Sequence, residues 1–157
     1  MLNKIEQWID QTNAKHKDQR HSCDRFTDDF KGYYPESFLK QAYYVVLDEI
    51  PKINFPELRQ FGFGDLMDMD ANGITYKDTY YITPNGINNL RLHFHELVHV
   101  VQWEKLGAQN FITRYMSEIQ NCGYTDAPLE KMAYALDARF SNKGEIIDVL
   151  NFVSEQL

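Results

Sequence analysis

Residues 90–106, with the sequence LRLHFHELVHVVQWEKL, decide how this chain is expected to fold. The stretch contains neither Gly nor Pro, and its apolar residues recur at helical spacing, which predicts a long helix. Apolar residues also occur on the other faces of this helix, so we expect it to lie near the centre of the domain. Gly107 follows directly and is a typical helix stop.

Two histidines and a glutamate stand inside this helix, in the order His95-Glu96-Leu97-Val98-His99. Positions i and i+4 of a helix project from the same face, so both imidazoles can reach one metal ion, with Glu96 close to a metal-bound water. The histidines lie beside the main apolar stripe, where buried imidazoles need partners and a metal ion satisfies both. Two ordinary histidines at chance spacing remain the alternative.

A catalytic zinc site holds three protein ligands and leaves one position for water, so a third ligand is needed. Glu130 is the candidate, because apolar residues flank it and the small Ala133 lets its helix pack close to the histidines. An acidic residue in the first turn of any helix is also favoured by the helix dipole, so Glu130 has an ordinary alternative role. Glu104 and Glu118 are weaker rivals, and Asp137 is a candidate hydrogen-bond acceptor for a ligand histidine.

The rest of the pattern predicts an α+β fold that is mainly helical, with a small β-hairpin before the metal-binding helix. The hairpin strands are expected at 74–76 and 79–82, which consist of β-branched and aromatic residues. A Lys77-Asp78 turn is expected to connect them. We expect loop at 15–29 and irregular structure at 51–73. Besides 90–106, helices are predicted over 2–15, 35–49, 109–121, 126–140 and 145–157.

A helix with H-E-x-x-H, followed by a second helix with a glutamate, resembles the zincin metallopeptidases of the gluzincin type. The small size is similar to that of the single-domain members called minigluzincins, and the resemblance covers about residues 74–140. It implies that His95, His99 and Glu130 bind Zn²⁺ and that Glu96 is the general base. By analogy with zincins, the strand at Thr79–Ile82 offers an edge that can pair with an extended peptide.

Two positions limit how far this resemblance extends. Many gluzincins have an aspartate four positions after the ligand glutamate, where this chain has Tyr134. Tyr134, with Tyr124 behind it, is a candidate donor to the substrate carbonyl oxygen, although a core tyrosine is an equal alternative. The residue six positions after His99 is Lys105 and no histidine lies downstream, which excludes the metzincins.

Composition limits the function classes. A chain of 157 residues is expected to form one domain over 1–157, and a net charge of −7 argues against nucleic acid or an anionic membrane surface as partner. The apolar stretches are too short to span a membrane and the first residues lack the apolar core of a signal peptide, so we expect a cytoplasmic protein. The oligomeric state stays open.

The two cysteines, Cys23 and Cys122, are far apart in the chain and are expected to be free thiols. Cys23 lies with His16 and His21 in the predicted loop, and a loop thiol there can in principle occupy the open zinc position and hold an enzyme latent. An ordinary solvated loop is the favoured interpretation.

The sequence therefore predicts a zinc-dependent metallopeptidase that cleaves a peptide or protein substrate with a zinc-bound water activated by Glu96. The alternative is a non-catalytic zinc-binding regulatory or interaction module on the same fold. Glu96 argues against that alternative, because a structural site has no use for a base. A third possibility is an interaction protein that never binds metal.

Overall fold

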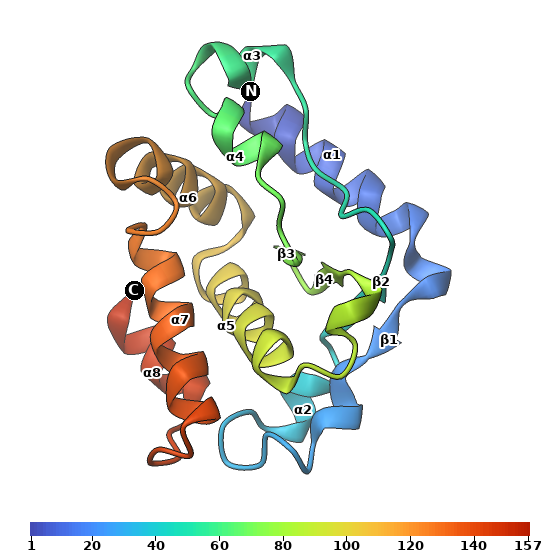
Figure 1. The fold of residues 1–157 in the computed structure, drawn as a ribbon, viewed down its shortest axis with the longest axis vertical. Helices are drawn as coiled ribbons and strands as arrows, with labels where there is room; N and C mark the ends of the chain where they lie inside the picture. Colours follow the sequence, from blue (N-terminus) through green and yellow to red (C-terminus); the bar gives the residue numbers. More distant parts are fainter.

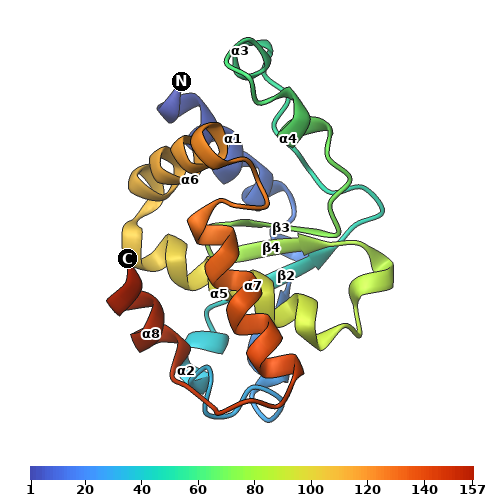
Figure 2. The same ribbon diagram turned by 60° about the vertical axis from the view of Figure 1, so that its left-hand side comes forward.

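The computed structural model describes residues 1–157, which form a mixed α+β fold built around one central helix. That helix, α5 (Leu90–Leu106), lies between a four-stranded sheet and the C-terminal helices α7 (Pro128–Ser141) and α8 (Val149–Gln156) (Figures 1 and 2). The remaining helices are α1 (Leu2–Lys15), α2 (Glu36–Leu39), α3 (Pro56–Gln60), α4 (Gly64–Asp68) and α6 (Ala108–Cys122). The strands are β1 (His21–Ser22), β2 (Tyr43–Val46), β3 (Gly73–Tyr76) and β4 (Thr79–Ile82).

The central helix has the expected bounds and the expected burial. Asn89 caps its first turn by accepting a hydrogen bond from the backbone N–H of Leu92 (3.2 Å). Gly107 ends it with a φ of 79°, a backbone conformation that favours glycine. Every side chain from His93 to Trp103 is buried, which confirms that α5 runs through the centre of the fold.

The sheet has the strand order β1-β2-β4-β3. The predicted hairpin is confirmed: β3 and β4 are antiparallel, and Lys77 makes their turn with a φ of 62°. The expectation that Thr79–Ile82 offers a free edge is wrong, because β4 also pairs in parallel with β2. The free edge beside α5 belongs to β3, so any strand addition at this end of the sheet must use residues of β3.

The helix predicted over 35–49 is also wrong beyond its first turn. Only Glu36–Leu39 is helical, and Tyr43–Val46 forms β2. The run Tyr-Tyr-Val-Val consists of aromatic and β-branched residues, which favour strands. Because both faces of this strand are covered, its apolar residues do not alternate with polar ones. Its apolar run therefore resembles a buried helix segment, and pairing with β4 selects the strand.

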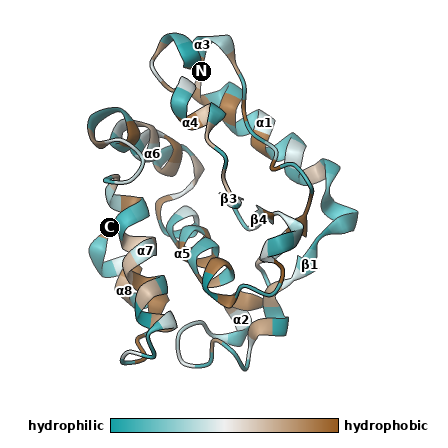
Figure 3. Cartoon of the chain, viewed as in Figure 1, coloured by the Kyte–Doolittle hydropathy of each residue, from teal (hydrophilic) through white to brown (hydrophobic).

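Most other elements lie close to their predicted bounds. Helix α1 is amphipathic, with Ile5 and Ile9 buried, and hydrophobic and hydrophilic residues alternate along it in Figure 3. Helices α6 and α7 are confirmed within a few residues. The last helix begins only at Val149, because the Asp148 side chain caps it by accepting a hydrogen bond from the N–H of Asn151 (3.2 Å).

Residues 51–73 include the short helices α3 and α4, and residues 15–29 include short 3₁₀ turns and β1. Cys23 and Cys122 are unpaired, as predicted. None of the helices has the length and apolar character needed to cross a membrane.

Candidate metal centre

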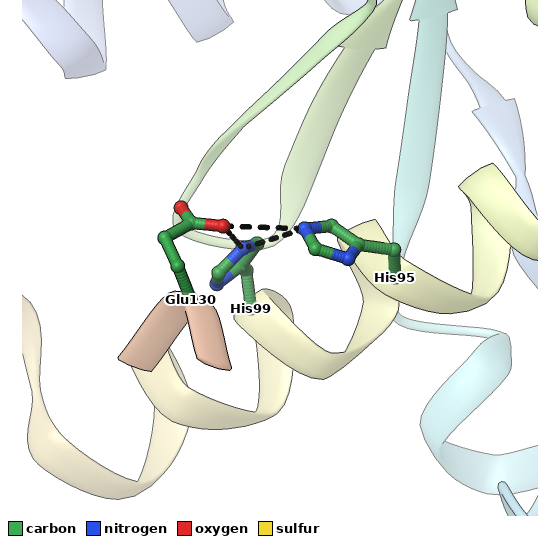
Figure 4. Close-up of side chains that lie close together, drawn as sticks. All are labelled: His95, His99 and Glu130. Atoms are coloured by element: carbon green, nitrogen blue, oxygen red, sulfur yellow. Dashed lines mark hydrogen bonds and ion pairs between the residues drawn. The ribbon is translucent and has the colours of Figure 1, made fainter. Parts of the chain in front are cut away.

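Three buried side chains meet where α7 crosses α5. Nε2 of His95 and Nε2 of His99 lie 3.2 Å apart, and Oε1 of Glu130 lies 3.3 Å from the first and 3.2 Å from the second. Figure 4 shows the two imidazoles on α5 and the carboxylate on α7 pointing toward one another. These three residues are the group in the chain that can hold a metal ion, which confirms the grouping of Glu130 with the two histidines.

The triangle of ligand atoms has the size that a tetrahedral metal site requires. Three atoms at corners of a tetrahedron, each about 2.0 Å from the central ion, lie about 3.3 Å apart. The three observed separations of 3.2, 3.2 and 3.3 Å fit this geometry. A fourth corner is left for a ligand from outside the triad, so the residues fit a metal ion with an open position.

Local sequence places Glu130 at this point. Pro128 occupies the first turn of α7, where its missing N–H is harmless, and Glu118 of α6 accepts a hydrogen bond from the next N–H, that of Leu129 (2.8 Å). One turn later Ala133 is wholly buried in the core, which lets α7 approach α5 closely. The short side chain of Glu130 therefore reaches the histidines.

His95 is oriented by a carboxylate. Its Nδ1–H donates to Oδ2 of Asp137 (2.7 Å), and Oδ1 of Asp137 accepts from Nε of Arg91 (2.7 Å). Asp137 is thus a hydrogen-bond acceptor for His95, one of the two histidines expected to be ligands. With the proton on Nδ1, the lone pair of His95 Nε2 faces the triad, as metal ligation requires.

His99 is oriented by an amide. Its Nδ1–H donates to Oε1 of Gln102 (2.8 Å), one helical turn further along α5. The other end of the amide, Nε2 of Gln102, donates to the carbonyl oxygen of Leu129 (3.0 Å), which fixes which way the amide points. The Nε2 lone pair of His99 is thereby also directed into the triad.

Glu96 lies beside the triad without being part of it. One oxygen, Oε1, accepts a hydrogen bond from the Thr75 hydroxyl of β3 (2.9 Å), while Oε2 lies 3.9 Å from Nε2 of His95. Gly73, two residues before Thr75 on the same face of β3, leaves room for this carboxylate, since a Cβ there would lie 3.2 Å from Cδ of Glu96. Glu96 is thus held beside His95 by its contacts with β3.

The charged groups in and around the triad shift the pKa values of its side chains. Burial acts to lower the pKa of His95, but the hydrogen bonds to Asp137 and Glu130 outweigh it and raise that pKa to about 10. Burial likewise acts to raise the pKa of Glu130, but the charge of His99 and the hydrogen bonds to both imidazoles lower it. The metal-free triad therefore holds protons that a metal ion must displace.

A cavity of about 150 Å³ opens next to the triad and shares Glu96, His99 and Glu130 as part of its wall. Most of its other lining side chains are hydrophobic, and they come from α1, residues 52–76, α5, α6 and Tyr124, which lies between α6 and α7. The largest of them include Trp103, Tyr76, Tyr115 and Phe111. An apolar chamber beside convergent polar groups is typical of a small-molecule or peptide side-chain site.

The other candidate residues from the sequence are not part of the triad. The ring of Tyr134 packs on the ring of His95 (centroids 4.5 Å apart), its side chain is 44% exposed, and its hydroxyl lies 3.3 Å from that of Tyr124. Glu104 is exposed and Glu118 supports the start of α7, so neither rival joins the triad.

Cys23 does not lie in a solvated loop. It is wholly buried, and its thiol donates a weak hydrogen bond to the hydroxyl of Tyr80 (3.6 Å). It is also not among the residues that can share a metal ion with His95 and His99. The hypothesis that this thiol occupies the metal position is therefore not supported.

Three residues around the site were missed by the sequence reasoning: Thr75, Gln102 and Tyr115. Gln102 had a detectable signal, since it lies three residues after His99 on the same helix face. Thr75 and Tyr115 come from β3 and α6, and their contacts with Glu96 and Glu130 exist only in the tertiary structure.

Comparisons with protein-family models, with curated proteins and with solved structures find no match to this chain. The function of this protein must therefore be inferred from its own residues and their geometry.

Proposed function

We propose that this protein is a zinc-dependent metallopeptidase with a zincin-like fold of the gluzincin type. The observation that carries the proposal is the buried triangle of His95, His99 and Glu130, with the carboxylate of Glu96 beside it. Two histidines and one glutamate are the ligand set of several zinc hydrolases, whereas structural zinc sites take four protein ligands. A site with three ligands and an adjacent base is typical of catalytic rather than structural zinc sites.

Zinc is the ion we assign, because imidazole and carboxylate donors in a tetrahedral arrangement suit it. When bound, Zn²⁺ supplies Lewis acidity, which acidifies water and polarises a carbonyl group. The chain supplies the orientation of its three ligands through Asp137 and Gln102.

Glu96 is assigned as general base and acid. The hydroxyl of Thr75 holds Oε1, so Oε2 is the oxygen left to accept a proton from the attacking water. The same carboxyl group delivers that proton to the amide nitrogen as the C–N bond breaks, so that the nitrogen leaves as a neutral amine. Burial of Glu96 beside the triad supports this role, because a solvated carboxylate would be screened from the reaction.

The substrate is proposed to be a peptide or protein in extended conformation. The free edge of β3 can pair with a peptide backbone, and the apolar cavity next to the triad can accept a large hydrophobic side chain. Tyr134, whose ring lies against His95, is the proposed donor to the substrate carbonyl oxygen.

The test combines zinc content with hydrolysis. The purified protein, reconstituted with zinc, is expected to bind about one ion per chain and to cleave members of a peptide library. Glu96→Gln and Glu96→Ala are expected to keep the zinc and lose the cleavage, whereas Glu104→Gln, an exposed glutamate on the same helix, keeps both.

Two outcomes would reject the proposal in different ways. Zinc below about 0.1 mole per mole after reconstitution would exclude a zinc enzyme and leave an interaction protein. Stoichiometric zinc without any cleavage that depends on Glu96 would favour the non-catalytic zinc-binding module.

A further inference from the structure

Glu130 has two oxygens with separate partners. Oε1 faces the two imidazoles at 3.2 and 3.3 Å, and Oε2 accepts a hydrogen bond of 2.7 Å from the hydroxyl of Tyr115 on α6. Carboxylates bind metal ions through one oxygen or through both. The oxygen that would complete two-oxygen binding is the one that Tyr115 occupies.

We propose that Tyr115 is a positioning residue that restricts Glu130 to one-oxygen ligation and thereby keeps the fourth metal position open. This inference rests on the metal site of the proposed function. It needs a metal ion at the triad, but it does not need hydrolysis.

The position of the Tyr115 hydroxyl is set by a stack of aromatic rings. The ring of Tyr115 stacks on that of Phe111, one turn earlier on α6 (5.6 Å, 13° between planes). Phe111 stacks in turn on Trp103 of α5 (4.1 Å, 21°). Trp103 lies four residues after His99, so the helix that carries the histidines also determines where Tyr115 stands.

This arrangement gives each of the three ligands an outer partner. Asp137 and Gln102 orient the imidazoles, but an imidazole offers the metal only one nitrogen in any case. For Glu130 the outer partner decides the number of ligand atoms as well as the orientation. Without the donor, the carboxylate can rotate toward two-oxygen binding, which fills the position that water or substrate would take.

The test is Tyr115→Phe, which removes the hydroxyl and keeps the ring stack. Tyr124→Phe is the matched control, because Tyr124 lines the same cavity but its hydroxyl contacts Tyr134 rather than Glu130. Zinc affinity is measured by competition with a chromophoric chelator. Metal geometry is measured from the visible absorption of the Co²⁺-substituted protein, which is more intense for four-coordinate than for five- or six-coordinate cobalt.

We expect Tyr115→Phe to weaken zinc affinity by about 10–100-fold, the usual effect of losing an outer partner, and to lower the intensity of the cobalt bands. Tyr124→Phe should match wild type in both measurements. Unchanged cobalt bands in Tyr115→Phe would overturn the inference whether or not affinity falls, and so would an equal change in Tyr124→Phe.

These readouts separate the inference from the proposed function. A wild-type protein that binds metal but cleaves no peptide would reject the peptidase and leave the role of Tyr115 to be decided by the cobalt bands. A wild-type protein that takes up neither zinc nor cobalt would overturn both.

Discussion

Asp137 and Glu130 lie seven residues apart on α7, two helical turns, and both contact His95: Asp137 at Nδ1 (2.7 Å) and Glu130 at Nε2 (3.3 Å). One face of α7 therefore supplies both Glu130, the carboxylate of the triad, and Asp137, the carboxylate that orients His95. Arg91 balances the charge of Asp137 from α5, although its side chain is half exposed. The two helices are thus joined through the site as well as through their apolar contacts.

The first prediction concerns Asp137. Asp137→Asn keeps the shape of the side chain and removes the charge that holds the proton of His95 on Nδ1. We expect zinc affinity to fall by about 10–100-fold in chelator competition. Asp126→Asn, an exposed aspartate just before α7, is the control and should bind zinc like wild type. Equal affinities in all three proteins would mean that Asp137 does not orient the ligand.

The second prediction concerns Glu130, whose ligand role the sequence alone left open. Glu130→Gln removes the anionic ligand atom while the two histidines remain. Two histidines give too few ligands for a stable zinc site, so the zinc content after dialysis should fall to near zero. Glu118→Gln tests the rival glutamate, and we expect it to retain zinc. Full zinc content in Glu130→Gln would show that another residue is the third ligand.

The third prediction concerns pH and metal binding. In the metal-free protein the pKa of His95 is raised to about 10, so at neutral pH the triad carries a proton that the metal must displace. Each displaced proton makes zinc affinity fall about tenfold per pH unit as the solution is acidified. Chelator competition at several pH values between 6 and 8 measures the slope. A flat profile would mean that no proton leaves on binding.

The same shift predicts the stability of the metal-free protein. The folded-state pKa of His95 lies above its unfolded value of about 6.5, so its contribution to stability is fully present below that pH. It is lost as the pH rises toward about 10. The denaturant midpoint of the metal-free protein should therefore decrease from pH 6 to 10, and excess zinc should reduce this decrease. His95→Ala is expected to show a flatter profile.

Some of this site could be predicted from the sequence because its information is local. The spacing of His95 and His99 on one helix is a property of the helix itself, and Gly107 marks its end. The prediction for Glu130 rested on weaker signals, its apolar flanking residues and the small Ala133, yet the structure brings it to the histidines.

Other parts depend on contacts between distant segments and could not be predicted in this way. The strand Tyr43–Val46 is apolar on both faces, so its periodicity does not distinguish it from a helix until β4 pairs with it. The partners of the carboxylates, Thr75 and Tyr115, were missed for the same reason. A threonine in a hairpin and a tyrosine in a helix are ordinary residues until tertiary structure places their hydroxyls.

Strand β3 holds Glu96 through the hydroxyl of Thr75, and this contact can be tested by mutation. Thr75→Val keeps the branched shape and removes the hydroxyl that donates to Oε1 of Glu96. Because neither residue belongs to the triad, zinc content should stay at the wild-type value, while kcat for peptide cleavage falls about tenfold or more and KM changes little. Thr75→Ser restores the hydroxyl and should restore most of kcat. Thr113→Val, an exposed threonine on α6, controls for the substitution itself.

Gly73→Ala tests the same contact from its other side. Its Cβ would lie 3.2 Å from Cδ and 3.3 Å from Oε2 of Glu96, closer than carbon and oxygen atoms comfortably approach, so the carboxylate must shift. We expect a loss of kcat with zinc retained, as in Thr75→Val, although the Thr75 hydroxyl is still present, because the added methyl group displaces the carboxylate from it. If Thr75→Val lost zinc together with activity, β3 would support the triad as a whole rather than orienting Glu96.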